Sequence, residues 1–152
     1  MLKICKSLCD LDFDKLCRTF DYDENCSTQR RKLYEYLSDD FFRRRGSFYA
    51  VWILNDEYVS SLRMEPFEDG LLLEALQTRS SDRRKGYAKK LLNGVLNSNI
   101  IAGKLPVYAH IYRNNHASKK LHSACGFRPH LDYARFIDGT TSANACTVKW
   151  IK

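Results

Sequence analysis

Apolar and polar positions along the first 46 residues follow a strand pattern and then a helical one. Residues 1–6 form a predicted strand, and Asp10 or Asp12 can cap a helix whose apolar residues recur at helical spacing. A second helix is predicted to begin near Ser27 and to end by Gly46. The apolar residues assigned to these two helices are Leu11, Leu16, Phe20, Leu33, Tyr34, Leu37, Phe41 and Phe42.

From residue 47 onward the apolar pattern changes to that of strands separated by turns. The runs 47–54, 58–64 and 71–77 are predicted strands, with turns over 55–57 and 66–70. The later predicted elements are helices over 86–97 and 115–125, a strand over 106–112, and a last antiparallel pair over 133–137 and 145–151. This order of elements predicts an α+β fold on one mixed sheet.

The length and composition fit one globular domain spanning residues 1–152. The 152 residues are 44% hydrophobic and 28% charged, which is ordinary for a folded protein long enough to bury a core. There is no apolar run of the ~18 residues that a membrane span requires, and residues 1–6 lack the features of a signal peptide. We therefore expect a cytoplasmic protein without a membrane partner.

Six cysteines are spread along the chain without the spacing of a metal site. None forms a C-x-x-C pair, and no histidine lies at zinc-site spacing from them. Because the chain shows no export signal, we expect reduced thiols, several of them in the core, and no bound metal. The alternative, a redox or nucleophilic role for Cys125, rests only on its place just before Gly126.

A net charge of +7 raises the hypothesis of nucleic-acid binding. The basic residues do not gather in one tail, however, and solvated helix faces account for two of their four clusters. The four clusters are residues 30–32, 43–45, 83–85 and 119–120. The third one differs, because it lies beside a glycine where a helix is predicted to begin. We therefore expect no nucleic-acid partner and a more specific role for the third cluster.

The third cluster opens the segment Arg83-Arg84-Lys85-Gly86-Tyr87-Ala88, between a predicted strand and a predicted helix. A strand-to-helix turn leaves several backbone N–H groups unpaired at the helix N-terminus, where the helix dipole also favours anions. The glycine lets a phosphate approach the backbone, and the basic side chains add charge-assisted hydrogen bonds. Two common phosphate loops, G-x-x-x-x-G-K-[ST] and G-x-G-x-x-G, are absent. The segment predicts a pyrophosphate site, with an exposed basic loop as the alternative.

Two segments resemble signatures of the GNAT N-acetyltransferase superfamily. Residues 76–88 resemble its coenzyme A motif, an apolar strand and polar loop followed by [RQ]-x-x-G-x-[GA], with Arg83, Gly86 and Ala88 at the three defining positions. Residues 115–127 resemble its second signature, which begins with Asn and ends with Gly-Phe. The order of elements agrees as well. The resemblance implies a GNAT-like, mostly antiparallel central sheet flanked by helices, and an acyltransferase that uses acetyl-coenzyme A.

The resemblance also implies how acetyl-coenzyme A, the cosubstrate, would be held. In the family the strand before the motif splays from the next strand, and the pantetheine arm lies between them. The end of this strand would bond the pantetheine amides, and the loop and first helical turn would hold the pyrophosphate. The cofactor-binding residues implied in this way are Leu76, Gln77, Thr78, Arg83, Arg84, Lys85, Gly86, Tyr87, Ala88, Lys89 and Asn115.

Direct attack of an amine on the acetyl group requires a base and an acid. Glu74, on the strand that borders the cleft, is the candidate base if burial raises its pKa, although it could equally face solvent or form a salt bridge. His110 is the alternative base, or a buried structural histidine. The family's usual acid is a tyrosine, but this chain has His122 at that position. His122 either donates the proton or only packs against the cofactor arm, and Tyr112 is a substitute candidate.

The acceptor is the least specified part of the predicted reaction. Arg63 lies where the family's acceptor site is bordered by a strand turn, and it could pair with the carboxylate of an amino-acid acceptor or merely with a nearby acid. The leading hypothesis is acetylation of a small-molecule amine or amino acid. The alternatives are a peptide or protein amine, and a coenzyme A-binding regulatory module without turnover. Because many members of the family dimerise, the resemblance also suggests a homodimer.

Overall fold

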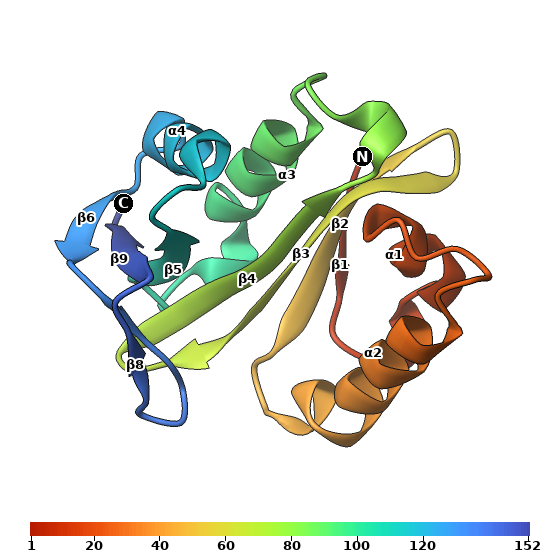
Figure 1. Ribbon diagram of the computed structural model, residues 1–152, viewed down its shortest axis with the longest axis horizontal. Helices are drawn as coiled ribbons and strands as arrows, with labels where there is room; N and C mark the ends of the chain where they lie inside the picture. The colour runs from red at the N-terminus through yellow and green to blue at the C-terminus, as the bar shows by residue number, and fades with distance from the viewer.

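The computed structural model describes residues 1–152 and is built around one seven-stranded sheet (Figure 1). The strands lie in the order β1-β2-β3-β4-β5-β9-β6, and every neighbouring pair is antiparallel except β4 and β5, which are parallel. These strands are β1 (Leu2–Cys5), β2 (Phe48–Leu54), β3 (Glu57–Phe67), β4 (Gly70–Thr78), β5 (Val107–Tyr112), β6 (Arg128–Leu131) and β9 (Ala145–Trp150). The predicted α+β fold on a mixed, mostly antiparallel sheet is confirmed.

Helices cover both faces of the sheet, α1 and α2 on one and α3 and α4 on the other (Figure 1). Alternation of side chains along β2 explains the two layers. Phe48 and Ala50 face the core on the α3 side, while Tyr49 and Val51 face the core beneath α1 and α2. The helices are α1 (Phe13–Thr19), α2 (Ser27–Asp39), α3 (Tyr87–Leu96) and α4 (His116–Ala124), with single 3-10 turns η1 (Leu8–Asp10), η2 (Phe41–Arg43), η3 (Ser80–Asp82) and η4 (Asn99–Ile101).

Both N-terminal helices are present, but the second is shorter than predicted. Asp12 caps α1 by accepting a hydrogen bond from the backbone N–H of Lys15 at 3.1 Å, as one of the two predicted caps. The helix α2 ends at Asp39, because the backbone of Asp40 leaves the helical region at φ −131° and ψ −68°. Phe41 therefore lies in the turn η2 and not on the helix.

The turn predicted over 66–70 is also shorter in the structure. The strand β3 continues through Phe67, and the turn consists of Glu68 and Asp69. A proline is tolerated at position 66 because β2 begins only at Phe48, opposite Met64, which leaves that edge of β3 without a hydrogen-bonding partner beyond Met64.

The C-terminal segments pair differently from the prediction. The strand β9 does not pair with residues 133–137; it lies between β5 and β6 and pairs with both. The strand β6 was not predicted, because its sequence Arg-Pro-His-Leu lacks an alternating apolar pattern, and its pairing comes from the free edge of β9. The short strands β7 (Ala134–Arg135) and β8 (Thr141–Ser142) pair with each other in a separate hairpin.

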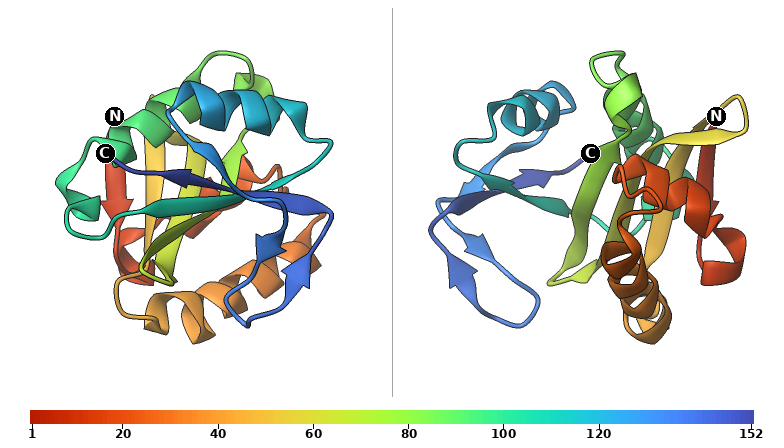
Figure 2. Two further views of the ribbon diagram at one scale, coloured as in Figure 1. Left: turned by 90° about the vertical axis from the view of Figure 1, so that its left-hand side faces the viewer. Right: turned by 45° about the vertical axis from the view of Figure 1, so that its right-hand side comes forward.

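The parallel pair β4 and β5 holds together at one end only. Leu71, Leu72 and Leu73 pair with residues 107–109, and no pairing continues beyond them. From Glu74 onward β4 runs beside β3 alone, and the two halves of the sheet diverge (Figure 2). The second half of β4 therefore has an open edge in the middle of the sheet, which is where the candidate site lies.

Candidate active site

A β-bulge lies in β4 where its pairing with β5 ends. Arg63 pairs with Glu74 and Ser61 pairs with Gln77, so the single residue between them on β3 faces two residues of β4. Ala75 takes up the extra length in the left-handed region, at φ +50°. Such a conformation is uncommon for a residue other than glycine, and bulges of this kind occur beside active sites, where they redirect side chains.

A groove with a volume of about 680 Å³ runs along the open edge of β4 between the start of α3 and α4; we call it the loop groove. Its lining residues are Leu76, Gln77, Thr78, Asp82, Arg83, Arg84, Gly86, Tyr87, Ala88, Lys89, Asn115, Ala117, Ser118 and Leu121. Every residue implied to bind the cofactor lines this groove except Lys85. The structure therefore brings the two sequence signatures together around one groove.

The backbone of the loop groove offers six consecutive free donors. None of the N–H groups from Arg84 to Lys89 donates a hydrogen bond within the chain, and the first helical bond of α3 is made by Lys90 to the carbonyl of Gly86. Arg84 and Gly86 both have positive φ angles, +64° and +83°, which turn the chain tightly before the helix begins. Unpaired N–H groups at a helix N-terminus, supported by the helix dipole, form an anion site that suits a phosphate.

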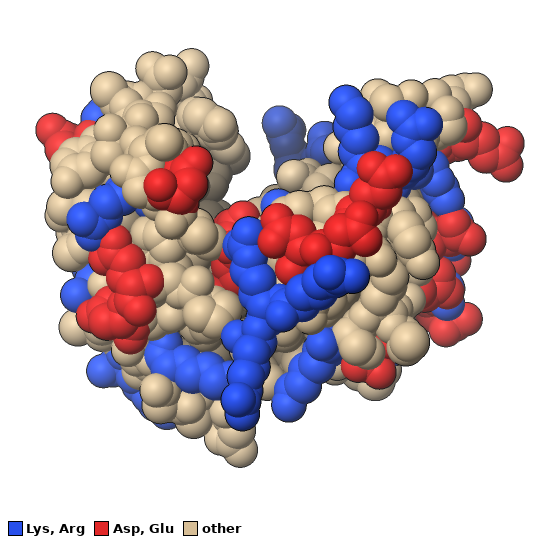
Figure 3. Space-filling model, turned by 90° about the horizontal axis from the view of Figure 1, so that it is seen from below, with Lys and Arg blue, Asp and Glu red and all other residues tan.

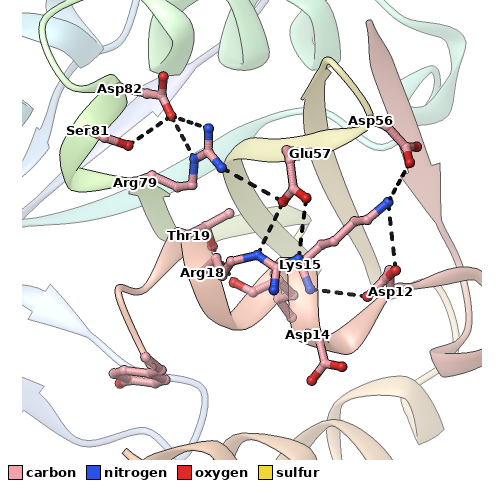
Figure 4. A network of polar contacts seen from close by, with 12 residues as sticks. Asp12, Asp14, Lys15, Arg18, Thr19, Asp56, Glu57, Arg79, Ser81 and Asp82 are labelled. Atoms are coloured by element: carbon pink, nitrogen blue, oxygen red, sulfur yellow. Dashed lines mark hydrogen bonds and ion pairs between the residues drawn. The ribbon is translucent and has the colours of Figure 1, made fainter. Parts of the chain in front are cut away.

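Ion pairs tie the loop before α3 to the opposite part of the fold (Figure 4). Arg79 donates from Nε to Asp82 Oδ2 at 2.6 Å and also lies 3.8 Å from Glu57, which begins β3. Glu57 in turn accepts from Arg18 of α1 at 3.2 Å. Burial alone would raise the pKa of Asp82, but the hydrogen bond and charge of Arg79 hold this pKa below its ordinary value. The network keeps Asp82 ionised and fixes the loop that carries the free N–H groups.

The basic side chains of the loop are not equally free. Arg83 folds back, donating from Nε to the Thr78 carbonyl at 3.1 Å and pairing with Asp21 at 3.0 Å. Lys85 lies 3.6 Å from Asp82. Arg84 is exposed and forms no ion pair within the chain. Arg84 is thus the guanidinium of this cluster that is available to an anion in the groove.

A second cavity, of about 490 Å³, begins at the β-bulge and extends beneath the hairpin of β7 and β8; we call it the hairpin cavity. Its lining residues are Arg44, Leu72, Leu73, Glu74, Ala75, His110, Tyr112, Phe136, Ile137 and Asp138. Seen from below, the molecule is hollowed between its two halves, and Lys and Arg side chains gather across the middle of this face (Figure 3). Residues 72–75 of β4 line this cavity, and residues 76–78 line the loop groove. The two spaces therefore meet along one strand.

Glu74 is the carboxylate at this meeting point. Its side chain is 25% exposed, it lies 3.7 Å from Arg63 Nη2, and its buried Oε1 has no hydrogen-bond partner. Burial, and then the neighbouring charge of Glu65, raise the pKa of Glu74 to about 7, while Arg63 acts in the opposite direction. Glu74 therefore changes protonation near neutral pH, as a general base requires.

Arg63 is held by the protein itself. It lies 3.5 Å from the Tyr49 hydroxyl and 3.7 Å from Glu74, and its guanidinium lies over the Tyr36 ring at 4.8 Å. It does not line the hairpin cavity. The prediction that Arg63 binds an acceptor carboxylate is untested, and the structure instead shows Arg63 as a partner of Glu74.

Two residues that shape the surroundings of Glu74 were not among the predicted site residues. Glu65 is 1% exposed and accepts a hydrogen bond from Arg44 at 2.5 Å, and Arg44 also pairs with Asp40 at 2.9 Å. Arg44 lies in the second basic cluster of the sequence, and Glu65 stands two residues from Arg63 in the same strand, so both could be located near the site by position. Their pairing depends on β3 meeting the end of η2, which no local pattern indicates.

Comparison with known proteins decides the family. A model of the Acetyltransferase (GNAT) family matches residues 13–127. The chain belongs to the GNAT acetyltransferase family. It is therefore an acyltransferase that depends on acetyl-coenzyme A, as predicted. No match was found among curated proteins.

Solved structures support the fold of this acetyltransferase over its whole length. A GNAT-family acetyltransferase from Desulfovibrio desulfuricans superposes with a TM-score of 0.70 at 12% identity, covering 99% of this chain and 97% of the other. The PaiA N-acetyltransferase from Thermoplasma acidophilum, solved in complex with coenzyme A, has a TM-score of 0.66 at 13% identity and covers 98% of both chains. A spermidine N-acetyltransferase SpeG chimera from Vibrio cholerae and hSSAT has a TM-score of 0.66 at 16% identity, covering 98% and 92%.

In this acetyltransferase the histidine at the family's tyrosine position lies away from the groove. His122 is 3% exposed, and its Nδ1 lies 2.8 Å from the Ser118 carbonyl one turn earlier in α4. It lines neither the loop groove nor the hairpin cavity but a third cavity on the β6 side of α4. Burial lowers the pKa of His122, which disfavours the charged form that would donate a proton. The role of His122 as general acid remains a prediction.

The substitute candidate for the acid, Tyr112, and the alternative candidate for the base, His110, both line the hairpin cavity. Tyr112, at the end of β5, is 65% exposed and lines the same cavity as Glu74. His110 packs edge-on against Phe67 and Phe136, with ring centroids 5.9 Å and 5.2 Å away, and burial lowers its pKa. Tyr112 therefore offers an accessible hydroxyl, while His110 is enclosed by aromatic rings.

The helices of the acetyltransferase are all too short or too polar to span a membrane.

Proposed function

We propose that this acetyltransferase binds acetyl-coenzyme A in the loop groove and transfers the acetyl group to a small-molecule primary amine in the hairpin cavity. The observation that carries this proposal is the division of β4 between the two spaces, residues 72–75 on one side and 76–78 on the other. A paired sheet would separate the two ligands. Because β4 and β5 part beyond Leu73, the reacting groups can meet through the opening.

The cofactor would be held mainly by the backbone. The six free N–H groups from Arg84 to Lys89 suit the pyrophosphate, and the Arg84 guanidinium adds a charge-assisted contact. The open edge of β4 at residues 76–78 suits the amides of the pantetheine arm. Asn115 caps α4 by accepting from the Ser118 N–H at 3.1 Å, which leaves its side-chain NH₂ free to donate into the groove.

Glu74 is the base in this proposal. An alkylammonium with a pKa of about 10 must lose a proton before it attacks, and a carboxylate whose pKa lies at about 7 accepts that proton at neutral pH, directly or through water. The amine nitrogen then forms a bond to the acetyl carbon while the bond from that carbon to sulfur breaks. The thiolate leaves with a proton from Tyr112, the accessible donor, and the second proton, which the nitrogen loses on becoming an amide, restores the tyrosine hydroxyl. No covalent enzyme intermediate is required.

A calorimetric titration with acetyl-coenzyme A tests the cofactor half of the proposal. Gly86 has a φ of +83° and open space where a Cβ would lie, so Gly86→Asp places a negative charge at the anion site without a steric clash. Gly103 has a φ of +73° and equally open space but does not line the groove. Gly103→Asp is therefore the matched control for backbone strain. We expect binding by the wild type and the Gly103 variant, and loss of binding in the Gly86 variant.

Thiol release in the presence of amines tests the transfer step. We expect turnover in the wild type that Glu74→Gln lowers by about 10² to 10⁴ while acetyl-coenzyme A still binds. Binding of the cofactor with no turnover on any amine would instead identify a coenzyme A-binding module without catalysis.

A further inference from the structure

One wall of the hairpin cavity is apolar and exposed. Phe136 and Ile137, in the turn between β7 and β8, are 38% and 45% exposed and line the cavity opposite Leu72 and Leu73 of β4. The same two side chains also line a neighbouring hollow of about 290 Å³ beside Pro66. Large apolar side chains exposed next to a cavity are characteristic of ligand sites. The wall continues beyond the space that a bare amino group would fill.

The carboxylates near this wall are already balanced by arginines. Glu65 is paired with Arg44 at 2.5 Å, and Glu74 with Arg63 at 3.7 Å. Asp138 is the one acid besides Glu74 that lines the cavity, and its Oδ1 accepts hydrogen bonds from the backbone N–H and the hydroxyl of Thr140 at 2.9 Å and 2.6 Å. A ligand with several positive charges would therefore find one acidic group that is not paired with an arginine.

The surroundings add positive charge. Arg43 and Arg45 flank Arg44 in the turn after α2, are exposed and form no ion pair within the chain. Figure 3 shows basic side chains across the middle of the hollowed face, with acidic side chains beside them. Like charges repel a polycation at the entrance to a cavity and lower its local concentration.

We propose that the acceptor is a monoamine with an apolar substituent, its amino group beside Glu74 and its substituent against Phe136 and Ile137. This inference rests on the proposed function and specifies its substrate class. It excludes polyamines such as spermidine, the compound in the name of one solved structure with the same fold. The apolar wall supplies the binding surface. Because the nearby carboxylates are already paired with arginines, they are not free to form the ion pairs that a polyamine would need.

The test compares phenethylamine, isopentylamine, ethylamine and spermidine as acceptors at saturating acetyl-coenzyme A. We expect kcat/KM for phenethylamine to exceed that for spermidine at least tenfold. Phe136→Ser and Ile137→Ser should each raise KM for phenethylamine roughly tenfold, with little change for ethylamine. Tyr133→Ser is the matched control, because Tyr133 is 39% exposed next to the same hairpin but lines neither the hairpin cavity nor the neighbouring hollow.

Two results would overturn the inference: a higher kcat/KM for spermidine, or equal losses for ethylamine and phenethylamine in both variants. Binding of phenethylamine to the coenzyme A complex, followed by calorimetry, separates this inference from the proposed function. If no amine were acetylated, the proposed function would fail. Binding that both hairpin variants weaken and the Tyr133 variant retains would still support the apolar subsite, and absence of binding would refute it.

Discussion

Replacing Glu74 with glutamine should make the protein more stable at alkaline pH while removing its activity. The carboxyl is three-quarters buried beside Glu65, and its pKa is raised from 4.5 to about 7 because the ionised form is poorly solvated and meets a second negative charge. Glutamine has nearly the same shape as the protonated acid and cannot ionise. The substitution therefore removes an unfavourable charge from the folded state together with the proposed general base.

The sign and size of this change in stability follow from the difference in proton binding between the folded and unfolded states. With a raised pKa, the folded protein holds the proton more tightly, so the stability contributed by Glu74 is complete below pH 4.5 and is lost as the pH rises to about 7. A pKa difference of about 2.5 corresponds to about 3 kcal/mol. The attraction of Arg63 opposes the shift and is already contained in it. We expect Glu74→Gln to exceed the wild type by up to about 3 kcal/mol at pH 8, and to match it at pH 4.5.

Urea denaturation followed by tryptophan fluorescence at pH 4.5 and pH 8 measures this difference. With a slope of about 2 kcal/mol per molar urea, the midpoint at pH 8 should rise by about 1.5 M. Glu24→Gln is the control, because Glu24 is exposed and its substitution should change stability by less than about 0.5 kcal/mol. In the same samples kcat should fall by about 10² to 10⁴. A variant that is equally or less stable than the wild type at pH 8 would refute the reasoning.

Three further outcomes are expected. Glu65→Gln removes the charge that helps to raise the pKa of Glu74, so the acidic limb of the kcat/KM profile should move to lower pH; an unchanged limb would contradict this coupling. Asp82→Ala removes the hydrogen-bond partner of Arg79 and should weaken acetyl-coenzyme A binding roughly tenfold, as measured by calorimetry. An unchanged affinity would show that other contacts fix the loop. Tyr112→Phe should lower kcat about 10²-fold, whereas His122→Gln should leave the pH profile intact; the reverse result would restore the histidine as the acid.

The groove proposed to hold the cofactor could be predicted from the sequence because its geometry is local. A strand, a tight turn and a helix start are adjacent in the chain, and the ligand groups are backbone N–H groups that any side chain at those positions would still supply. Gly86 marks one of the two left-handed positions of this turn, and Arg84 takes the other. Only Lys85 lies outside the groove, since its side chain turns to Asp82. The bulge at Ala75 could not be predicted, because alanine gives no signal for a positive φ.

The acceptor half could not be predicted in the same way, for a physical reason. The residues that line the hairpin cavity come from the end of η2, from β4, from β5 and from the β7–β8 turn, and two of them pair with residues of β3. The sheet decides how these elements meet. In the sequence Glu65 resembles any polar residue of a strand. Its burial at 1% exposure is explained by its ion pair with Arg44, which the sequence does not indicate.

This difference bears on how the substrate of such an enzyme can be inferred. In the proposed function the loop groove holds the cosubstrate mainly through backbone N–H groups, which do not depend on the neighbouring side chains, so this groove carries no information about the acceptor. In the proposed function acceptor choice depends on the side chains of the hairpin cavity, where Glu74 is paired with Arg63, Asp138 is held by Thr140 and the apolar wall is left open. Adding an unpaired negative charge to the cavity should therefore change acceptor specificity without changing cofactor binding. Phe136→Glu would add an unpaired negative charge to the wall, and we expect it to lower kcat/KM for phenethylamine, to raise it for spermidine, and to leave the Kd for acetyl-coenzyme A unchanged.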